Sequence, residues 1–326
     1  MKKLFTTLAL SLAASLAASL VASHAAAQTF PSKPVKLIVP FSAGSGTDIV
    51  ARTVGEFMAK GLGQPVVVEN RPGAGGTLAA AAVARGEADG HTVLVPSSGH
   101  AVNPSIYPNL SYDTLKDLTG VTPLVAMPNV LVVSPARGWK SVADMVAAAK
   151  AKPGALNYAS AGMGSATHFN AEKFRLQAGL DAVHVPFKGT PEAISDIIGG
   201  RSDWFFAPMS SALPLIRDGK LQALAVSTAR RSSLLPDGPT TVEAGVPGSD
   251  YTFWVAFVVP SATPAAAVQR LQQEAAKALA QPELIEKLAK IGAEPMLMPT
   301  AEFNTFIRNE VEVAARVAKA ANLKAQ

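Results

Sequence analysis

Residues 41–48 read FSAGSGTD and join a strand-like run to a helix-like run. The preceding run, VKLIV at residues 35–39, is apolar and β-branched and therefore predicts a buried strand. The following run, residues 48–62, repeats apolar side chains at helical spacing, and Gly61 and Gly63 predict where this helix ends. Together the three segments predict a βα unit whose turn is built from small residues.

The rest of the chain repeats this alternation of strands and helices. Further strands are predicted at residues 66–69, 92–96, 129–133, 156–160, 182–186, 202–206, 221–227 and 251–260. Further helices are predicted at residues 77–85, 141–150, 168–179, 191–198, 264–280, 282–291 and 301–322. Repeated βα units predict an α/β fold with a mostly parallel sheet and helices on both of its faces.

Two long extended stretches, residues 121–135 and 251–261, divide the chain into thirds and predict two crossings between domains. We expect domain 1 to comprise residues 28–125 and 253–326, and domain 2 to comprise residues 126–252. Two open α/β domains joined by two crossing strands leave a ligand cleft, which is lined by the loops at the carboxyl ends of the strands.

The N-terminus has the order of a secretory signal peptide. Two lysines precede the uncharged apolar run of residues 4–22, and small residues at 23–27 supply an Ala25-x-Ala27 site. We expect residues 1–27 to be removed near Ala27 and the mature protein to work outside the cytoplasm. The alternative is an uncleaved membrane anchor, since the run approaches the roughly 20 residues that span a bilayer. The Ala- and Ser-rich composition and the cleavage site favour removal.

Composition narrows the classes of function. The chain contains no cysteine, which excludes disulfides, thiolate metal sites and a lipoprotein anchor. Its 29 Lys and Arg residues are scattered among 24 Asp and Glu residues, with a formal net charge of +5, so we expect no nucleic-acid partner. The histidine spacing offers no metal-binding motif, and we expect no metal, no cofactor and a monomeric protein.

The turn at residues 41–48 suits an anion. Its small residues let backbone N–H groups face outward, and the following helix presents unpaired N–H groups and the positive end of its dipole. It is neither a Walker loop, since no Gly-Lys-Ser/Thr follows, nor a dinucleotide fingerprint, since Ile49 occupies the last glycine position. Asp48 in the first helical turn argues against a polyphosphate. The alternative is an ordinary βα turn in which Asp48 caps the helix.

A second turn of this kind, AGMGSATH at residues 161–168, lies in the predicted second domain, where Ser165 and Thr167 add hydroxyl groups. Both turns follow strands, so we expect them to face each other across the cleft. Residues 97–100 and 206–211 are predicted to form further walls. The candidate ligand-binding residues are Phe41, Ser42, Ala43, Gly44, Ser45, Gly46, Thr47, Asp48, Ser97, Ser98, Ser160, Gly162, Gly164, Ser165, Thr167, His168, Ala207 and Pro208.

A third glycine-rich loop, NRPGAGGT at residues 70–77, also looks like a phosphate loop. The favoured interpretation is a rigid turn that places Arg71 on the surface.

No catalytic residue is predicted. His100, His168 and His184 lie far apart in the chain, and neither a Gly-x-Ser-x-Gly motif nor paired carboxylates accompany them. Ser165 and His168 could touch within one helical turn, which leaves a hydrolase as the least favoured hypothesis. A pocket rich in neutral donors suits binding and release better than bond making, so we expect the protein not to be an enzyme.

Several sequence blocks point to a known family. They are FPSKP at 30–34, LIVPF at 37–41, GQPVVVENRPGAGG at 63–76, DGHT at 89–92, AKAKPG at 149–154, HVPFKG at 184–189 and PTTVEAG at 239–245. On these blocks, of which residues 63–76 are the most specific, the chain resembles the Bug family. Members of this family are periplasmic solute-binding receptors of tripartite tricarboxylate transporters.

The resemblance implies a two-domain periplasmic-binding-protein fold of type II that closes on its ligand. It also implies that the turns at residues 41–48 and 160–168 hold a carboxylate through backbone N–H groups and small hydroxyls. Where the family commonly has Pro-Pro-Gly-Gly, this chain has SAGSG at 42–46, which keeps small residues and adds a hydroxyl.

The implied function is capture of a small carboxylate and its delivery to the membrane subunits of such a transporter. A ligand-sensing subunit for a membrane two-component kinase is the alternative. The ligand is either an aliphatic di- or tricarboxylate or an aromatic acid. The aromatic side chains that could flank an aromatic acid, or equally belong to the core, are Phe41, Trp204, Phe205 and Trp254.

Overall fold

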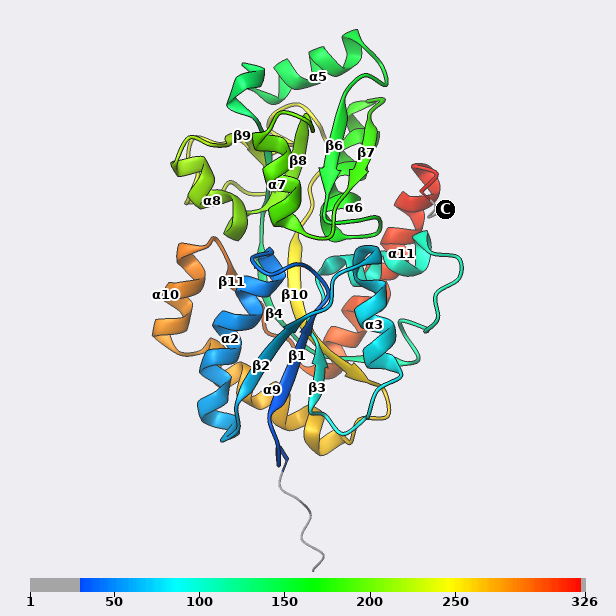
Figure 1. The fold of residues 1–326 in the computed structure, drawn as a ribbon, viewed down its shortest axis with the longest axis vertical. Coiled ribbons are helices and arrows are strands. Elements are labelled where there is room, and N and C mark those ends of the chain that lie inside the picture. Colours follow the sequence, from blue (N-terminus) through cyan, green and yellow to red (C-terminus); the bar gives the residue numbers. More distant parts are fainter. Residues whose placement is uncertain (1–29, 324–326) are drawn as a thin grey trace, which may run out of the picture.

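A computed structural model describes residues 30–323 of the chain (Figure 1). It contains two β-sheets that follow one another along the long axis, each covered by helices. The predicted signal peptide, residues 1–27, lies outside the described residues. Within residues 30–323, no helix is both long enough and apolar enough to cross a membrane.

The first sheet has six strands in the order β11-β4-β10-β3-β1-β2. The adjacent strands β2, β1 and β3 run parallel to one another, whereas β10 runs antiparallel to both β3 and β4. The strand bounds are β1 (Val35–Val39), β2 (Val66–Asn70), β3 (Thr92–Leu94), β4 (Leu118–Met127), β10 (Phe253–Pro260) and β11 (Glu294–Pro295).

The second sheet has five strands in the order β7-β6-β8-β5-β9. Here β7, β6 and β8 run parallel, and β5 runs antiparallel to both β8 and β9. The strand bounds are β5 (Asn129–Val133), β6 (Asn157–Ser160), β7 (Val183–Pro186), β8 (Trp204–Pro208) and β9 (Gln222–Val226).

The prediction of a mostly parallel sheet is wrong, because both sheets are mixed. Strand–helix–strand alternation places the three strands on one side of each sheet parallel, as expected. Strands β5 and β10 run against these parallel strands. They come from the extended stretches that cross between the sheets, where no helix intervenes to restore the strand direction.

Helices cover both faces of the first sheet. On one face, α2 (Gly46–Leu62), α9 (Ala265–Leu279) and α10 (Pro282–Lys290) pack on a core that includes Val54, Leu271 and Leu284. On the other face lie α3 (Thr77–Ala84) and α11 (Thr300–Ala320), with α4 (Asn103–Ile106) beside α11.

The second sheet shows the same layering, and alternate residues of β5 show why. Leu131 and Val133 pack with α5 (Val142–Ala151) and α6 (Ala166–Ala178) on one face. Val130 and Val132 pack with α7 (Thr190–Ile198) and α8 (Met209–Arg217) on the other. Every residue of β5 is buried, as expected for a strand covered on both faces.

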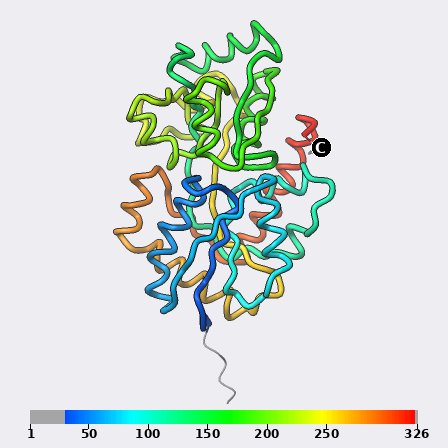
Figure 2. Tube along the Cα trace, in the orientation of Figure 1, coloured from blue at the N-terminus to red at the C-terminus, as the bar shows by residue number. Residues whose placement is uncertain are grey.

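The chain passes between the two sheets twice. It leaves the first sheet at the end of β4, enters the second through Pro128, and returns through residues 251–252 into β10 (Figure 2). The predicted two-domain α/β architecture is therefore confirmed. The predicted domain boundaries after residues 125 and 252 stay a prediction.

Candidate functional site

A cavity lies between the two domains, where the N-termini of α2 and α6 meet. Its volume is about 10 Å³, so a ligand larger than a water molecule enters only when the domains move apart. The lining residues are Phe41, Ser45, Gly46, Thr47, Ser97, Ala161, Ser165, Ala166, Thr167, Thr190, Pro208 and Phe253.

Ser45 begins α2 and shapes the first wall of the cavity. Its side chain accepts a hydrogen bond from the Asp48 N–H at 3.4 Å, which satisfies one of the free N–H groups of the first helical turn. Within residues 30–323, no hydrogen bond uses the N–H of Gly46 or Thr47. These two N–H groups, at the positive end of the 17-residue helix, are available to an anion.

Ser165 has the same role at the start of α6. Its side chain accepts from the His168 N–H at 3.2 Å and lies 3.1 Å from Thr167 Oγ1, which accepts from the Ala161 N–H at 2.9 Å. The N–H groups of Ala166 and Thr167 take part in no hydrogen bond within the described chain. Two helix N-termini, one from each domain, therefore line the same cavity.

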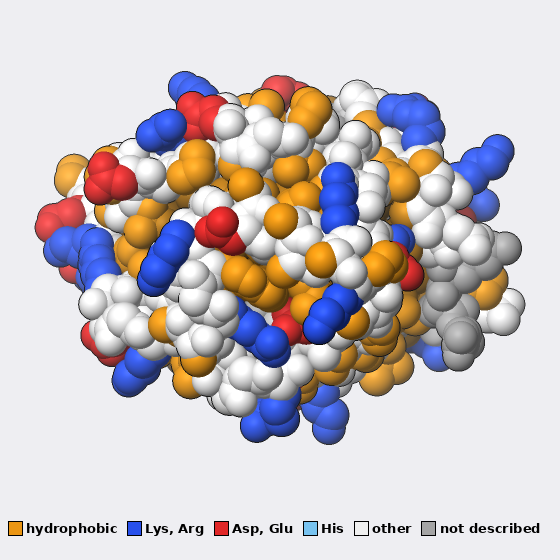
Figure 3. Space-filling view, turned by 90° about the horizontal axis from the view of Figure 1, so that it is seen from above, with side chains coloured by type: hydrophobic (Ala, Val, Ile, Leu, Met, Phe, Trp, Pro, Cys, Tyr) orange, Lys and Arg blue, Asp and Glu red, His pale blue; other side chains and the backbone are white. Residues whose placement is uncertain are grey.

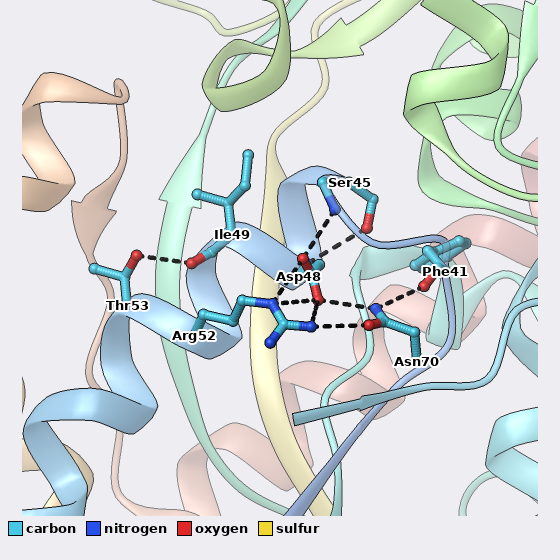
Figure 4. A network of polar contacts seen from close by, with 8 residues as sticks. Phe41, Ser45, Asp48, Ile49, Arg52, Thr53 and Asn70 are labelled. Atoms are coloured by element: carbon cyan, nitrogen blue, oxygen red, sulfur yellow. Dashed lines mark hydrogen bonds and ion pairs between the residues drawn. The ribbon is translucent and has the colours of Figure 1, made fainter. Parts of the chain in front are cut away.

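The first turn is held in shape by the Asp48 carboxylate (Figure 4). It accepts hydrogen bonds from the Gly44 N–H at 2.9 Å, the Asn70 amide at 2.8 Å and the Arg52 guanidinium at 3.1 Å. Burial alone would raise the pKa of Asp48, but these hydrogen bonds and the Arg52 charge hold it below its ordinary value. Asp48 does not line the cavity, and its contacts are those of a residue that fixes the turn.

The second turn rests on two buried histidines. His168 Nδ1 accepts from the Gly164 N–H at 3.3 Å, and Ser160 Oγ accepts from the Gly162 N–H at 3.0 Å while it contacts His184 Nε2 at 2.6 Å. The His168 and His184 ring centroids lie 4.2 Å apart, although the residues are distant in the chain.

Burial keeps both rings neutral. It lowers the pKa of His168 to about 3, assisted by the Arg175 charge, and lowers that of His184 also to about 3, assisted by His168. A neutral ring is what the contact with Gly164 needs, because only an unprotonated Nδ1 can accept a hydrogen bond.

The cavity offers neutral hydrogen-bond donors rather than charged side chains. None of its lining residues, all of them in the described part of the chain, carries a charged side chain. Ser165 Oγ meets the backbone N–H of His168, while the His168 ring is engaged with Gly164, so no serine–histidine pair of the hydrolase type forms there. Within residues 30–323, no cluster of three His, Cys, Asp or Glu side chains could hold a metal ion.

The domains contact each other around the cavity. Ser42 Oγ donates to Glu192 Oε1 at 2.6 Å, Tyr107 OH donates to the Met163 carbonyl at 2.8 Å, and Ser211 Oγ donates to the Gly44 carbonyl at 3.3 Å.

The loop at residues 70–77 also takes part in the interdomain contact. A Cβ added to Gly75 would lie 1.8 Å from the Met163 carbonyl oxygen of the second domain. The predicted surface position of Arg71 agrees with the structure, where Arg71 is exposed and pairs with Glu69 at 2.6 Å. The close approach of Gly75 to Met163 was not predicted.

The profile of the tripartite tricarboxylate transporter family receptor matches residues 50–323. The chain belongs to this family. It is 35% identical over 301 residues to Protein BugT of Bordetella pertussis, and the match covers 92% of both chains. The resemblance to the Bug family is thus confirmed, and the family is one of periplasmic solute-binding receptors.

Solved structures of receptors in this class superpose closely. An R. palustris protein with adipate gives a TM-score of 0.87 at 33% identity, over 91% of this chain and 100% of that one. MatC from Rhodopseudomonas palustris with bound malate gives 0.84 at 33% identity, over 88% and 99%. The periplasmic binding protein BugD gives 0.87 at 30% identity, over 91% and 100%. The predicted two-domain periplasmic-binding-protein fold is confirmed.

Some of the predicted ligand-binding residues line the interdomain cavity of the receptor, and others lie outside it. The predicted residues that line it are Phe41, Ser45, Gly46, Thr47, Ser97, Ser165, Thr167 and Pro208. The predicted residues that lie outside its lining are Ser42, Ala43, Gly44, Asp48, Ser98, Ser160, Gly162, Gly164, His168 and Ala207. Among the latter, Ser42 and Gly44 make interdomain contacts, and Asp48, Ser160 and His168 support the turns. A role of any of them in ligand binding stays a prediction.

Sequence analysis missed several lining residues of the receptor. Ala161 and Ala166 lie inside the predicted second turn but were not among the candidate residues, and Thr190 and Phe253 lie outside every predicted wall. Thr190 could have been predicted, because it directly follows the HVPFKG block and precedes Pro191, which indicates the start of a helix. The aromatic candidates Trp204, Phe205 and Trp254 lie in the cores of the domains, away from the cavity.

Proposed function

We propose that this receptor captures a small carboxylate between its two domains and delivers it to the membrane subunits of a tripartite tricarboxylate transporter. The observation that carries the proposal is the convergence of two helix N-termini, α2 and α6, on one cavity without charged side chains. Each helix end offers two N–H groups that no described residue uses, together with a neighbouring hydroxyl.

The magnitudes fit such a role. Micromolar capture needs about 8 kcal/mol. Hydrogen bonds to a charged group contribute about 1.5–3 kcal/mol each, so four N–H groups and the hydroxyls of Thr47, Ser97 and Thr190 supply enough before ordering costs. The cost of ordering the ligand and closing the domains offsets part of this gain. An arginine is not needed.

Among carboxylates, we propose an aliphatic di- or tricarboxylate over an aromatic acid. Two similar receptors were solved with adipate and with malate, which are aliphatic. In this chain the aromatic side chains that line the cavity are Phe41 and Phe253, while Trp204 and Trp254 are buried elsewhere.

The location follows from the same proposal. Residues 1–27 act as a signal peptide that is removed near Ala27, and the mature monomer works in the periplasm with a hinge near residues 125–126 and 252–253. Lys and Arg side chains are spread among neutral and acidic ones over the face seen from above (Figure 3), a pattern that does not resemble a nucleic-acid surface. Mass spectrometry of exported protein should give a chain that begins at Gln28.

Isothermal titration calorimetry with a panel of carboxylates tests the binding role. We expect saturable binding of at least one aliphatic di- or tricarboxylate, no turnover of the bound ligand, and weaker binding of benzoate. Exclusive binding of aromatic acids would overturn the choice of ligand class, and silence across the panel would overturn the proposal itself. The hydrolase hypothesis rested on Ser165 and His168, but Ser165 Oγ meets the backbone N–H of His168 and not its ring. The kinase-sensor alternative would bind the same ligand and stays a prediction.

A further inference from the structure

A second pocket lies between α6 of the second domain and α11 of the first. Its volume is about 320 Å³, which is within the range of small-molecule sites, roughly 300–1,000 Å³. We call it the α6–α11 pocket and describe it by six of its lining residues. These are Phe169, Lys173, Tyr251, Trp254, Phe306 and Glu310.

Both domains and the returning crossing build this pocket. Phe169 and Lys173 are one helical turn apart on α6, and Phe306 and Glu310 are one turn apart on α11. The C-terminal end of α11 reaches the second domain, where Leu323 packs in one cluster with Phe169 (Figure 1). A molecule in the pocket would therefore touch both domains.

Aromatic rings form two of the pocket's walls. Phe169 and Tyr251 meet edge to face with ring centroids 5.9 Å apart, and Trp254 and Phe306 do the same at 5.9 Å. The Tyr251 hydroxyl donates to Ser98 Oγ at 2.8 Å, which fixes the ring. Faces of such rings attract cations through their quadrupole, most strongly when water is excluded.

Glu310 places a carboxylate among these rings. It is half-buried, and within the described chain its contact is a long hydrogen bond from Trp254 Nε1 at 3.5 Å, with no Lys, Arg or His within ion-pair distance. Carboxylates withdrawn from water are normally paired with a cation. Burial raises the pKa of Glu310, the direction expected for a carboxylate in this environment.

Lys173 does not fill the role of that cation. Its ammonium group donates to the Asp250 carbonyl and lies 3.9 Å from the Asp250 carboxylate. The positive charge of Lys173 acts on both Asp250 and Glu310, and it lowers the pKa of Glu310 against the effect of burial. With two carboxylates opposite one lysine, the lining of the pocket keeps a net negative charge. The walls thus combine aromatic side chains with an acid, and both kinds of group attract an organic ammonium ion.

We propose that the α6–α11 pocket is a second ligand site, which binds a small organic ammonium ion with its charge on Glu310 and its apolar body against the partly exposed Phe306 and Tyr251. The site is separate from the carboxylate cavity. It is also independent of the proposed transport role, because none of its recognition groups lines that cavity.

Calorimetry with phenethylamine tests the site on the full mature chain at neutral pH. We expect saturable binding of phenethylamine, and binding of its neutral counterpart phenethyl alcohol at least tenfold weaker. Glu310→Gln keeps the shape of the side chain and removes its charge, and it should weaken phenethylamine binding about tenfold or more. Glu312→Gln is the matched control, since it makes the same change on an exposed position of α11 and should have no effect.

The remaining outcomes are also decisive. Absence of phenethylamine binding, equal binding of the alcohol, or equal losses in Glu310→Gln and Glu312→Gln would each overturn the proposal. If Glu310→Gln fails to fold, Phe306→Leu replaces it and should weaken phenethylamine binding several-fold through loss of a ring wall. The double variant Ser165→Ala with Thr167→Val should leave phenethylamine binding intact, which separates this site from the carboxylate site.

Discussion

Ser45 and Ser165 hold the same backbone conformation on opposite sides of the interdomain cavity. Their φ and ψ angles are −67° and 157° for Ser45, and −66° and 160° for Ser165. Each side chain accepts a hydrogen bond from the backbone N–H of the residue three positions later. The first two residues of each helix line the cavity, and their N–H groups remain available to a ligand. Each domain therefore contributes an equivalent anion-binding helix end.

Removal of the hydroxyls of the second helix end should weaken carboxylate binding. In Ser165→Ala with Thr167→Val, we expect at least a tenfold loss of affinity for the best aliphatic dicarboxylate by calorimetry, because hydroxyl contacts and the order of the turn are both lost. The free energy of unfolding should fall by about 1 kcal/mol from the lost cap, with the fold retained. Ser195→Ala, which removes an exposed hydroxyl from α7, is the control. Unchanged affinity would show that the second turn is structural.

Closure of the domains should depend on Gly99. A Cβ added there would lie 2.7 Å from the Ala166 nitrogen and 2.8 Å from the Gly164 oxygen, which are backbone atoms of the other domain and cannot yield. In Gly99→Ala we expect the domains to stay apart at saturating ligand, so the radius of gyration from X-ray scattering should exceed that of the wild type. The affinity of Gly99→Ala for the carboxylate ligand should be lower than that of the wild type.

Gly199→Ala provides the control for Gly99→Ala. Its added Cβ would meet the flexible end of Arg201 at 2.9 Å, at an exposed helix end within the second domain, so the radius of gyration should not change. Equal compaction of Gly99→Ala and the wild type would contradict the assignment of this contact to closure.

Asp48 should stabilise the first domain at neutral pH. Its folded-state pKa lies below the unfolded value of about 3.9, so its stabilisation is present above the unfolded pKa and is lost as the pH falls through the folded pKa. In Asp48→Asn the free energy of unfolding at pH 7 should fall by about 1.5–3 kcal/mol, because a charged acceptor of several hydrogen bonds is removed. The difference from the wild type in urea unfolding should shrink toward pH 3. Asp218→Asn, at an exposed position, should change little.

Local chemistry made the two turns predictable. Residues 41–48 and 161–168 each combine small residues, a capping serine and a following helix, and these features act within a few residues of the chain. Local sequence patterns also predicted the strands and helices. They could not predict the antiparallel direction of β5 and β10, because it depends on how the crossing segments pair with strands distant in the chain.

The support beneath the second turn was not predictable for the same reason. His184 reaches Ser160 and His168 because β6 and β7 pair in parallel, with Tyr158 opposite His184. Nothing near either histidine in the chain fixes that register. Sequence analysis therefore treated the histidines as unrelated, whereas the fold makes them neighbours.

The buried histidines should make the protein sensitive to acid. Burial lowers the pKa of His100 to about 4, and those of His168 and His184 to about 3, whereas unfolded histidine titrates near 6.5. Between the folded and unfolded pKa values, the unfolded state binds more protons than the folded state. The free energy of unfolding is therefore highest above about pH 6.5 and falls as the pH drops below it. Each histidine contributes a slope of up to about 1.4 kcal/mol per pH unit.

The slope itself can be dissected with variants. Urea unfolding between pH 6 and pH 4.5 should give a steep loss of stability in the wild type, a smaller slope in His184→Gln, and a slope lower by about two protons in His168→Gln with His184→Gln. The amide of Gln can still contact Ser160, so the single variant should fold. Because the slope reports proton uptake rather than stability, a general destabilisation by these substitutions would shift the curves without flattening them. Parallel curves for all three proteins would therefore contradict neutral, buried rings beneath the second turn.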